Sequence, residues 1–172
     1  MINQQTTNKY TSYFDKYIDL VEEKDVLKAI KNSAKTLKKI VKNMDEEKAN
    51  YSYQQGKWTI KELFVHLLDT ERVFAYRILA ISRGEQIELP SFDEDNYVLY
   101  SNATNRSFKS IKKELLVVRK STILLFKSLT SEMLERKGIA GGNELNPTKI
   151  GFILVGHQAH HLNVLKSKYL LN

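Results

Sequence analysis

Three of the four histidines in this sequence fall within five positions, in the stretch GHQAHHLNVL at 156–165. His157 and His161 are four residues apart, so a helix places their imidazoles one turn apart on the same face. Two imidazoles at this spacing can bind one metal ion, as they do in helical zinc sites. His160 lies to the side of the pair and reaches only the rim of such a site. The alternative is that these histidines are core residues that hydrogen-bond to their neighbours.

A metal site normally needs at least three protein ligands, and the absence of cysteine excludes a thiolate ligand. His66, the remaining histidine, is therefore the obvious third candidate. It lies on a second predicted helix, in a stripe with Thr70, Val73 and Arg77 that flanks the main apolar stripe. The spacing leaves two alternatives open. Either this stripe faces the bundle interior beside a helix seam, or His66 is a half-exposed histidine.

Acidic residues near these positions raise a separate question. Glu71 falls within the main apolar stripe of the second helix, and a buried carboxylate without a partner is costly. We expect a structural ion pair, with Arg77, Arg119 or Arg72 as the partner. The alternative is that Glu71 orients a histidine ligand or acts as a base on a bound water.

A second acidic group, in the stretch FDEDNYV at 92–98, lacks the glycine and the later glutamate of a calcium-binding loop. Its residues Asp93 and Asp95 could instead belong to a lid over the metal. The sequence does not decide whether either of them contributes to the site.

The composition favours one mostly helical domain that spans residues 1–172. Hydrophobic residues make up 42% of the chain, and there are only seven glycines and two prolines. The absence of cysteine excludes disulfides and a cysteine nucleophile, and it fits a reducing compartment. The N-terminal segment lacks the basic start and apolar run of a signal peptide, and no apolar stretch is long enough for a membrane span. We therefore expect a cytoplasmic protein with no membrane partner.

The formal net charge of +7 raises the alternative of a nucleic-acid partner. The lysines are spread out, however, and the clusters KTLKK at 35–39 and KSIKK at 109–113 alternate with apolar residues at helical spacing. This pattern is typical of a solvated helix face. We expect no nucleic-acid partner.

Apolar stripes at steps of three and four residues predict four helices, over residues 25–44, 59–83, 107–134 and 146–170. The second helix has the clearest start, because Thr59 and Glu62, which follow Trp58 in the sequence, can form a capping box. An aromatic-rich segment at 10–21 is expected to form a short lead-in helix, and the connection at 84–106 is unusually long. Four apolar stripes with no strand pattern between them predict an all-α four-helix bundle.

The stretches GKWTIKELFVHLLDTERVFAYRILAISRGE, LPSFDEDNYV and GHQAHHLNVLKSKYL together resemble the DinB/YfiT-like superfamily, over residues 13–169. The resemblance implies an up-and-down four-helix bundle with a long crossover loop. It also implies a divalent metal bound by His66, His157 and His161, with His160 at a position that is not a ligand.

Three histidine ligands leave coordination positions for water or substrate, which is typical of a catalytic ion. We therefore expect a metal-dependent enzyme, a thiol transferase or a hydrolase, that acts on a small molecule and binds zinc or nickel. The substrate would be a small molecule such as a low-molecular-weight thiol, and a homodimer is the default assembly. The alternative is a non-catalytic bundle, stabilised by its metal, or a binding module.

Overall fold

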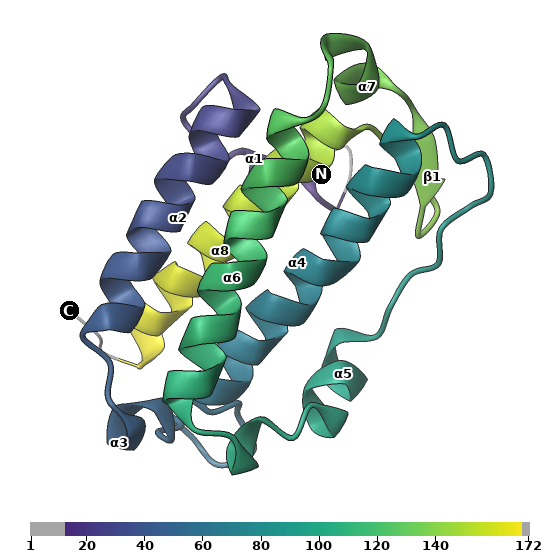
Figure 1. Ribbon diagram of the computed structural model, residues 1–172. Helices are drawn as coiled ribbons and strands as arrows, with labels where there is room; N and C mark the ends of the chain where they lie inside the picture. The colour runs from purple at the N-terminus through teal and green to yellow at the C-terminus, as the bar shows by residue number, and fades with distance from the viewer. Residues whose placement is uncertain (1–12, 170–172) are drawn as a thin grey trace, which may run out of the picture.

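The computed structural model describes residues 13–169, and its main feature is a bundle of four long helices (Figure 1). They are α2 (Val26–Lys42), α4 (Ile60–Ser82), α6 (Phe108–Lys127) and α8 (Pro147–Lys168). The shorter elements are α1 (Asp15–Ile18), α3 (Glu46–Ala49), α5 (Glu94–Tyr100), the 3-10 helix η1 (Ala103–Asn105), α7 (Ser131–Glu135), and the strands β1 (Gly138–Ala140) and β2 (Asn143–Leu145). The predicted all-α four-helix bundle is confirmed. No helix in residues 13–169 is long and apolar enough to cross a membrane.

The starts of the bundle helices follow from local side-chain capping. At α4 the predicted capping box is confirmed: the Glu62 N–H donates to Thr59 Oγ1 at 3.2 Å, and the Thr59 N–H donates to Glu62 Oε2 at 2.7 Å. At α8 the side chain of Asn146 accepts from the Lys149 N–H at 2.7 Å, and Pro147 occupies the first turn. These caps satisfy N–H groups that the helix itself leaves without partners.

The segment before α8 differs from the prediction of one helix over 107–134. Helix α6 ends at Lys127, and the Thr130 side chain accepts from the Met133 N–H to begin the separate helix α7. The apolar periodicity continues across the break, so periodicity alone cannot locate it, whereas the new N-cap can. After α7 the antiparallel strands β1 and β2 form a hairpin whose turn contains Gly141 and Gly142, both with positive φ.

The directions of the four helices explain the long crossover. Helices α2 and α8 run one way, and α4 and α6 run the other (Figure 1). Helices α4 and α6 are therefore parallel neighbours, and the order of directions is not a strict alternation. The chain must return along α4 between them, and α5 and η1 lie on this return and contact α4. The predicted crossover is confirmed, and its second half contains the short helices α5 and η1.

Two apolar clusters make up the core, and a layer of buried polar side chains lies between them. One cluster includes Phe64, Leu68, Ile111, Leu115 and Leu165, and the other includes Ile30, Phe74, Ile78, Phe126 and Ile153. Between them, each bundle helix contributes one residue to the polar layer: Ser33, Glu71, Arg119 and Gln158. Arg119 donates to Glu71 at 2.7 Å and to Ser33 Oγ at 2.6 Å, and Gln158 donates to the Ser33 carbonyl at 3.0 Å.

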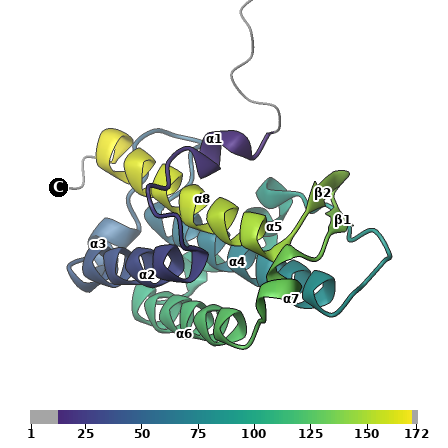
Figure 2. The ribbon, with the colours of Figure 1, turned by 90° about the horizontal axis from the view of Figure 1, so that it is seen from above.

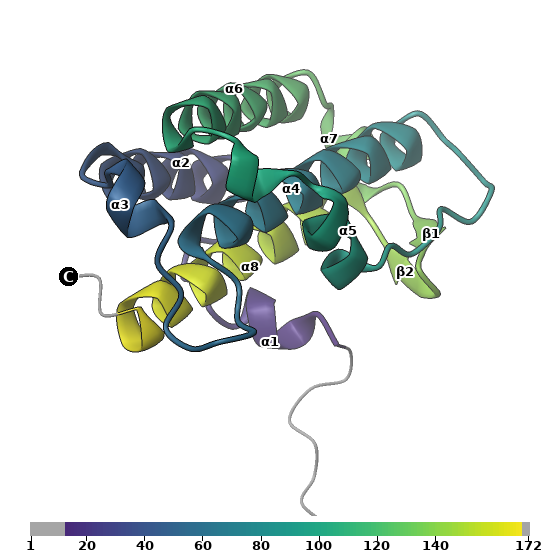
Figure 3. The same cartoon turned by 90° about the horizontal axis from the view of Figure 1, so that it is seen from below.

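The short helix α1 packs directly on α8, as expected for a lead-in element (Figure 2). Gly156 permits this contact, because a Cβ at that position would stand 1.9 Å from the Tyr17 carbonyl oxygen. Residues 10–12 of the predicted lead-in segment lie outside the described residues. Helix α1, helix α5 and the β1–β2 hairpin all lie on the side of α4 and α8 that faces away from α2 and α6 (Figure 3). These three elements surround the site described next.

Candidate metal centre

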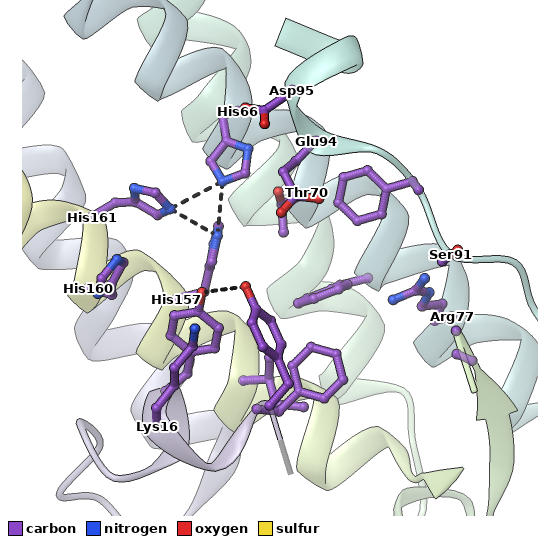
Figure 4. A pocket seen from close by; sticks show the side chains of 18 of the residues that line it. Lys16, His66, Thr70, Arg77, Ser91, Glu94, Asp95, His157, His160 and His161 are labelled. Atoms are coloured by element: carbon purple, nitrogen blue, oxygen red, sulfur yellow. Dashed lines mark hydrogen bonds between the residues drawn. The ribbon is translucent and has the colours of Figure 1, made fainter. Parts of the chain in front are cut away.

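Helices α4 and α8 bring the three predicted histidines together. His66 comes from α4, and His157 and His161 come from successive turns of α8 (Figure 4). The Nε2 atom of His66 lies 3.0 Å from that of His157 and 3.2 Å from that of His161, and the last two are 3.1 Å apart. The structure thus decides between the two alternatives for His66, which faces inward and is only 5% exposed.

Aromatic rings hold two of these imidazoles in place. The Trp58 ring packs on His66 with 5.0 Å between ring centroids, and the Tyr17 ring packs edge-on against His157 at 5.4 Å. Tyr17 also contacts His160, with 5.6 Å between ring centroids, so that α1 covers two of the three α8 histidines on one side. The aromatic lead-in segment is therefore part of the site, a role that its sequence did not indicate.

The three histidines fit the requirements of a divalent metal. Their Nε2 atoms form a nearly equilateral triangle with sides of 3.0–3.2 Å, so one point can lie about 2.0–2.1 Å from all three, as zinc–nitrogen bonds require. Among the described residues these three make up the one group of histidine and carboxylate donors close enough to hold an ion. His160 does not belong to this group, in agreement with what the resemblance implies.

Burial keeps these imidazoles in the neutral form that binds metals. It lowers the pKa of His66 from its ordinary value to about 4. Burial also lowers the pKa of His161 to about 3, with smaller effects from His66 and His160. The pKa of His157 is held well below its ordinary value, first by burial and then by the other histidines. A metal ligand must be deprotonated, so the site is ready to bind at neutral pH.

The histidines form part of the wall of a cavity of about 440 Å³. Its other polar lining residues come from four elements and the segments beside them, and they include Lys16, Thr70, Arg77, Ser91, Glu94 and Asp95. Cavities of this size are typical of sites for small organic molecules. The triad therefore faces a space that a substrate can enter.

Comparison with known proteins identifies the family. The profile of the DinB superfamily matches residues 29–165, which include most of the bundle and all three histidines. The chain belongs to the DinB superfamily. This confirms the resemblance found in the sequence.

Two relatives of this DinB superfamily protein are informative. A protein from Oceanobacillus iheyensis, which carries the provisional name of a metal-dependent hydrolase, is 25% identical over 141 residues, 81% of this chain and 81% of that protein. The solved structure of YfiT from Bacillus subtilis is described as a probable metal-dependent hydrolase with an unusual four-helix bundle topology. It matches with a TM-score of 0.71 and 17% identity, covering 95% of this chain and 93% of its own. At this identity the likeness to YfiT shows the fold.

The structure places Glu71 in the core of this DinB superfamily protein. Of the three arginines considered as partners, Arg119 forms the ion pair, and Glu71 is only 1% exposed. Glu71 is not among the residues that line the cavity. Its contacts in the structure are those of a structural ion pair.

The two aspartates of the crossover have different positions. Asp93 caps α5 by accepting from the Asn96 N–H at 3.0 Å, and it does not line the cavity. Asp95 and its neighbour Glu94 do line the cavity, near His66 (Figure 4). The sequence reasoning named Asp95 but missed Glu94. The acidic cluster at the start of a capped helix was the signal that could have pointed to it.

The lowered histidine pKa values predict how stability depends on pH in the metal-free protein. Unfolded histidine takes up a proton near its ordinary pKa of 6.5, whereas His66 does so near 4 in the folded state. The stabilisation is therefore complete above about pH 6.5 and is lost as the pH falls toward 4. We expect the free energy of unfolding, measured by urea denaturation, to fall between pH 7.5 and 5 by up to about 1.4 kcal/mol per pH unit for each proton taken up, and the urea midpoint to fall with it.

The matched variant for this measurement is His161→Asn, which removes one of the three titrating histidines of the centre. It should have a shallower pH dependence than the wild type over the same range. A midpoint that is constant or rises on acidification would contradict the prediction.

Proposed function

We propose that this protein is a metal-dependent hydrolase that acts on a small molecule in the cavity beside its three histidines. One observation carries the proposal: His66, His157 and His161 converge through Nε2 atoms 3.0–3.2 Å apart in the wall of an open cavity. The names of the relatives support it, because one carries the provisional name of a metal-dependent hydrolase and the other is described as a probable one. We propose zinc or nickel as the metal, since three neutral imidazoles suit both.

A divalent ion held by three imidazoles supplies Lewis acidity and lowers the pKa of a bound water. The residues of the chain bind the ion and fix the positions of its ligands. The three histidines hold the ion, and Trp58 and Tyr17 keep two of the rings in position. Neutral imidazoles add no negative charge, so the ion retains its full positive charge toward the substrate.

We assign the proton acceptor to Glu94. Its carboxylate lines the cavity, and its side chain points inward at the end that holds His66 (Figure 4). A carboxylate there can accept a proton from the nucleophile at one of its Oε atoms and return it to the leaving group. Because Glu94 is on α5, the crossover supplies this group while α4 and α8 supply the histidines.

The experiment compares hydrolysis of 4-nitrophenyl acetate by metal-free protein, by protein reloaded with zinc or nickel, and by the Glu94→Gln variant. We expect metal to restore hydrolysis, and Glu94→Gln to lower kcat by about 100-fold or more while leaving metal content unchanged, since general base catalysis contributes on that scale. Glu47→Gln, an exposed change on α3 outside the cavity, is the matched control and should retain full activity.

A parallel assay with a low-molecular-weight thiol and 1-chloro-2,4-dinitrobenzene separates the two reaction classes. Metal-dependent conjugation of the thiol without ester hydrolysis would overturn hydrolysis in favour of thiol transfer. Activity that persists unchanged after metal removal would contradict a metal-dependent mechanism, and no activity in any form would favour a non-catalytic bundle.

A further inference from the structure

The cavity beside the histidines has carboxylates at one end and a buried guanidinium at the other, and Lys16 lines it on the side of His160 (Figure 4). The carboxylates of Glu94 and Asp95 lie near His66, whereas Arg77 lies near Ser91 at the other end (Figure 4). A substrate that enters this cavity therefore meets a metal site with acidic neighbours at one end and a guanidinium at the other. This separation of charge indicates that the reacting part of the substrate lies at the histidine end and that an anionic part lies at the Arg77 end.

Arg77 is a buried cation with no carboxylate partner among residues 13–169. Arg77 is only 4% exposed. None of the described carboxylates lies within ion-pair distance of its guanidinium. Arg119 is equally buried, at 3% exposed, but has Glu71 as a partner at 2.7 Å. An unpaired buried charge is costly, so it is rarely retained without a use. An anionic ligand would supply the missing partner.

The surroundings of Arg77 leave its guanidinium largely free to bind. One nitrogen, Nη2, donates to the Pro90 carbonyl at 2.7 Å. The Phe74 and Phe92 rings flank the group, with centroids 5.5 Å and 5.9 Å from its central carbon. These rings hold the guanidinium plane but cannot neutralise it. Arginine has five N–H donors, and a fork of two suits a carboxylate or a phosphate.

The hydroxyl of Thr70 is a second group in the same cavity without a partner. Thr70 is 2% exposed, and its Oγ1 has no hydrogen bond among the described residues. Two other threonines inside long helices bond to the carbonyl one turn earlier: Thr122 to Val118 at 3.1 Å and Thr36 to Asn32 at 3.3 Å. Thr70 lacks this local bond and lines the cavity one turn after His66. Its hydroxyl is therefore a buried polar group at the cavity wall that still lacks a hydrogen-bond partner in the described part of the chain.

We propose that Arg77 binds an anionic group of the substrate, a carboxylate or a phosphate, while Thr70 hydrogen-bonds to the part of the substrate that lies between Arg77 and the histidines. The inference rests on the proposed function, because it takes the cavity as the substrate site. His66 and Arg77 are eleven residues apart on α4, a rise of roughly 16 Å along the helix. The substrate is therefore an elongated organic anion whose reacting bond lies far from its charge.

Direct binding to the metal-free protein tests this assignment without any catalysis. The probes are hexanoate, hexyl phosphate and 1-hexanol, which share a tail and differ in the head group, and affinity is measured by calorimetry. We expect at least one anion to bind at least about 10-fold more tightly than 1-hexanol, since a charge-assisted bidentate contact is worth more than a neutral one. The tighter of the two anions identifies the head group of the natural substrate.

Four variants separate charge from structure. Arg77→Gln should weaken binding of the anion by about 10-fold or more, and Arg77→Lys should retain part of it because the positive charge remains. Thr70→Val should weaken it by a few fold. Arg83→Gln, which removes an exposed arginine of the same helix end outside the cavity, should leave it unchanged.

Equal affinity for all three probes, or equal loss in Arg77→Gln and Arg83→Gln, would overturn the proposal. So would unchanged binding in Arg77→Gln. If Arg77→Gln fails to fold, the folded Arg77→Lys variant provides the test. The proposal would be overturned if this variant lost affinity for the anions and for 1-hexanol by the same factor. Anion binding without ester hydrolysis by the metal-loaded protein would support this site while contradicting the proposed hydrolase activity, so the two failures are distinguishable.

Discussion

Replacing His157 by alanine is expected to leave the purified protein almost without metal. His157 supplies one of three donors whose Nε2 atoms are 3.0–3.2 Å apart, and two imidazoles alone hold a divalent ion weakly. Loss of an outer partner of a metal ligand already costs about 10–100-fold in affinity, so loss of a ligand should cost more than about 100-fold. Metal per chain, measured by mass spectrometry on untagged protein, should fall from near one to a small fraction.

His160→Ala is the matched control for this experiment. It removes a histidine from the same helix, and one that packs on the same Tyr17 ring, but not one of the three donors. Its metal content should stay close to that of the wild type. If His157→Ala kept its metal, or if both variants lost it equally, the assignment of the ligands would be wrong.

Replacing Glu71 by glutamine is expected to lower the free energy of unfolding by about 3–5 kcal/mol, because it leaves a buried guanidinium without its counter-charge. Glu71 and Arg119 are the ion pair of the polar layer between the two apolar clusters, and both are almost fully buried. The effect should appear in urea denaturation of the metal-free protein, where metal binding does not contribute. A combined change, Glu71→Leu with Arg119→Met, should recover much of the loss.

Glu114→Gln provides the comparison with a more exposed pair. Glu114 accepts from Arg72 and Arg106 but its side chain is 28% exposed, so its loss should cost about 1 kcal/mol or less. Metal content decides the remaining alternative for Glu71. If Glu71→Gln kept its stability but lost its metal, Glu71 would act on the histidine ligands rather than in a structural ion pair.

Much of this protein can be predicted from local sequence rules. Apolar periodicity located the four bundle helices except for the end of α6 at Lys127, and the Thr59–Glu62 capping box placed the start of α4 at the correct residue. The spacing of His157 and His161 placed both imidazoles on one face of α8. These features depend on residues within one or two helical turns, and the backbone geometry of a helix is the same wherever the helix lies.

The rest depended on how separate helices pack. Helical spacing could not show whether His66 faced the seam, because that depends on the rotation of α4 against α8. The same rotation turns Glu71 toward Arg119 and turns Thr70 and Arg77 toward the cavity. The hairpin and α5 line the cavity, but they are short elements. Their apolar patterns span too few residues to predict a strand or a helix. The sequence alone determined which residues share a helix face, and only the tertiary structure decided what each face meets, because burial against a particular neighbour is a property of the whole chain.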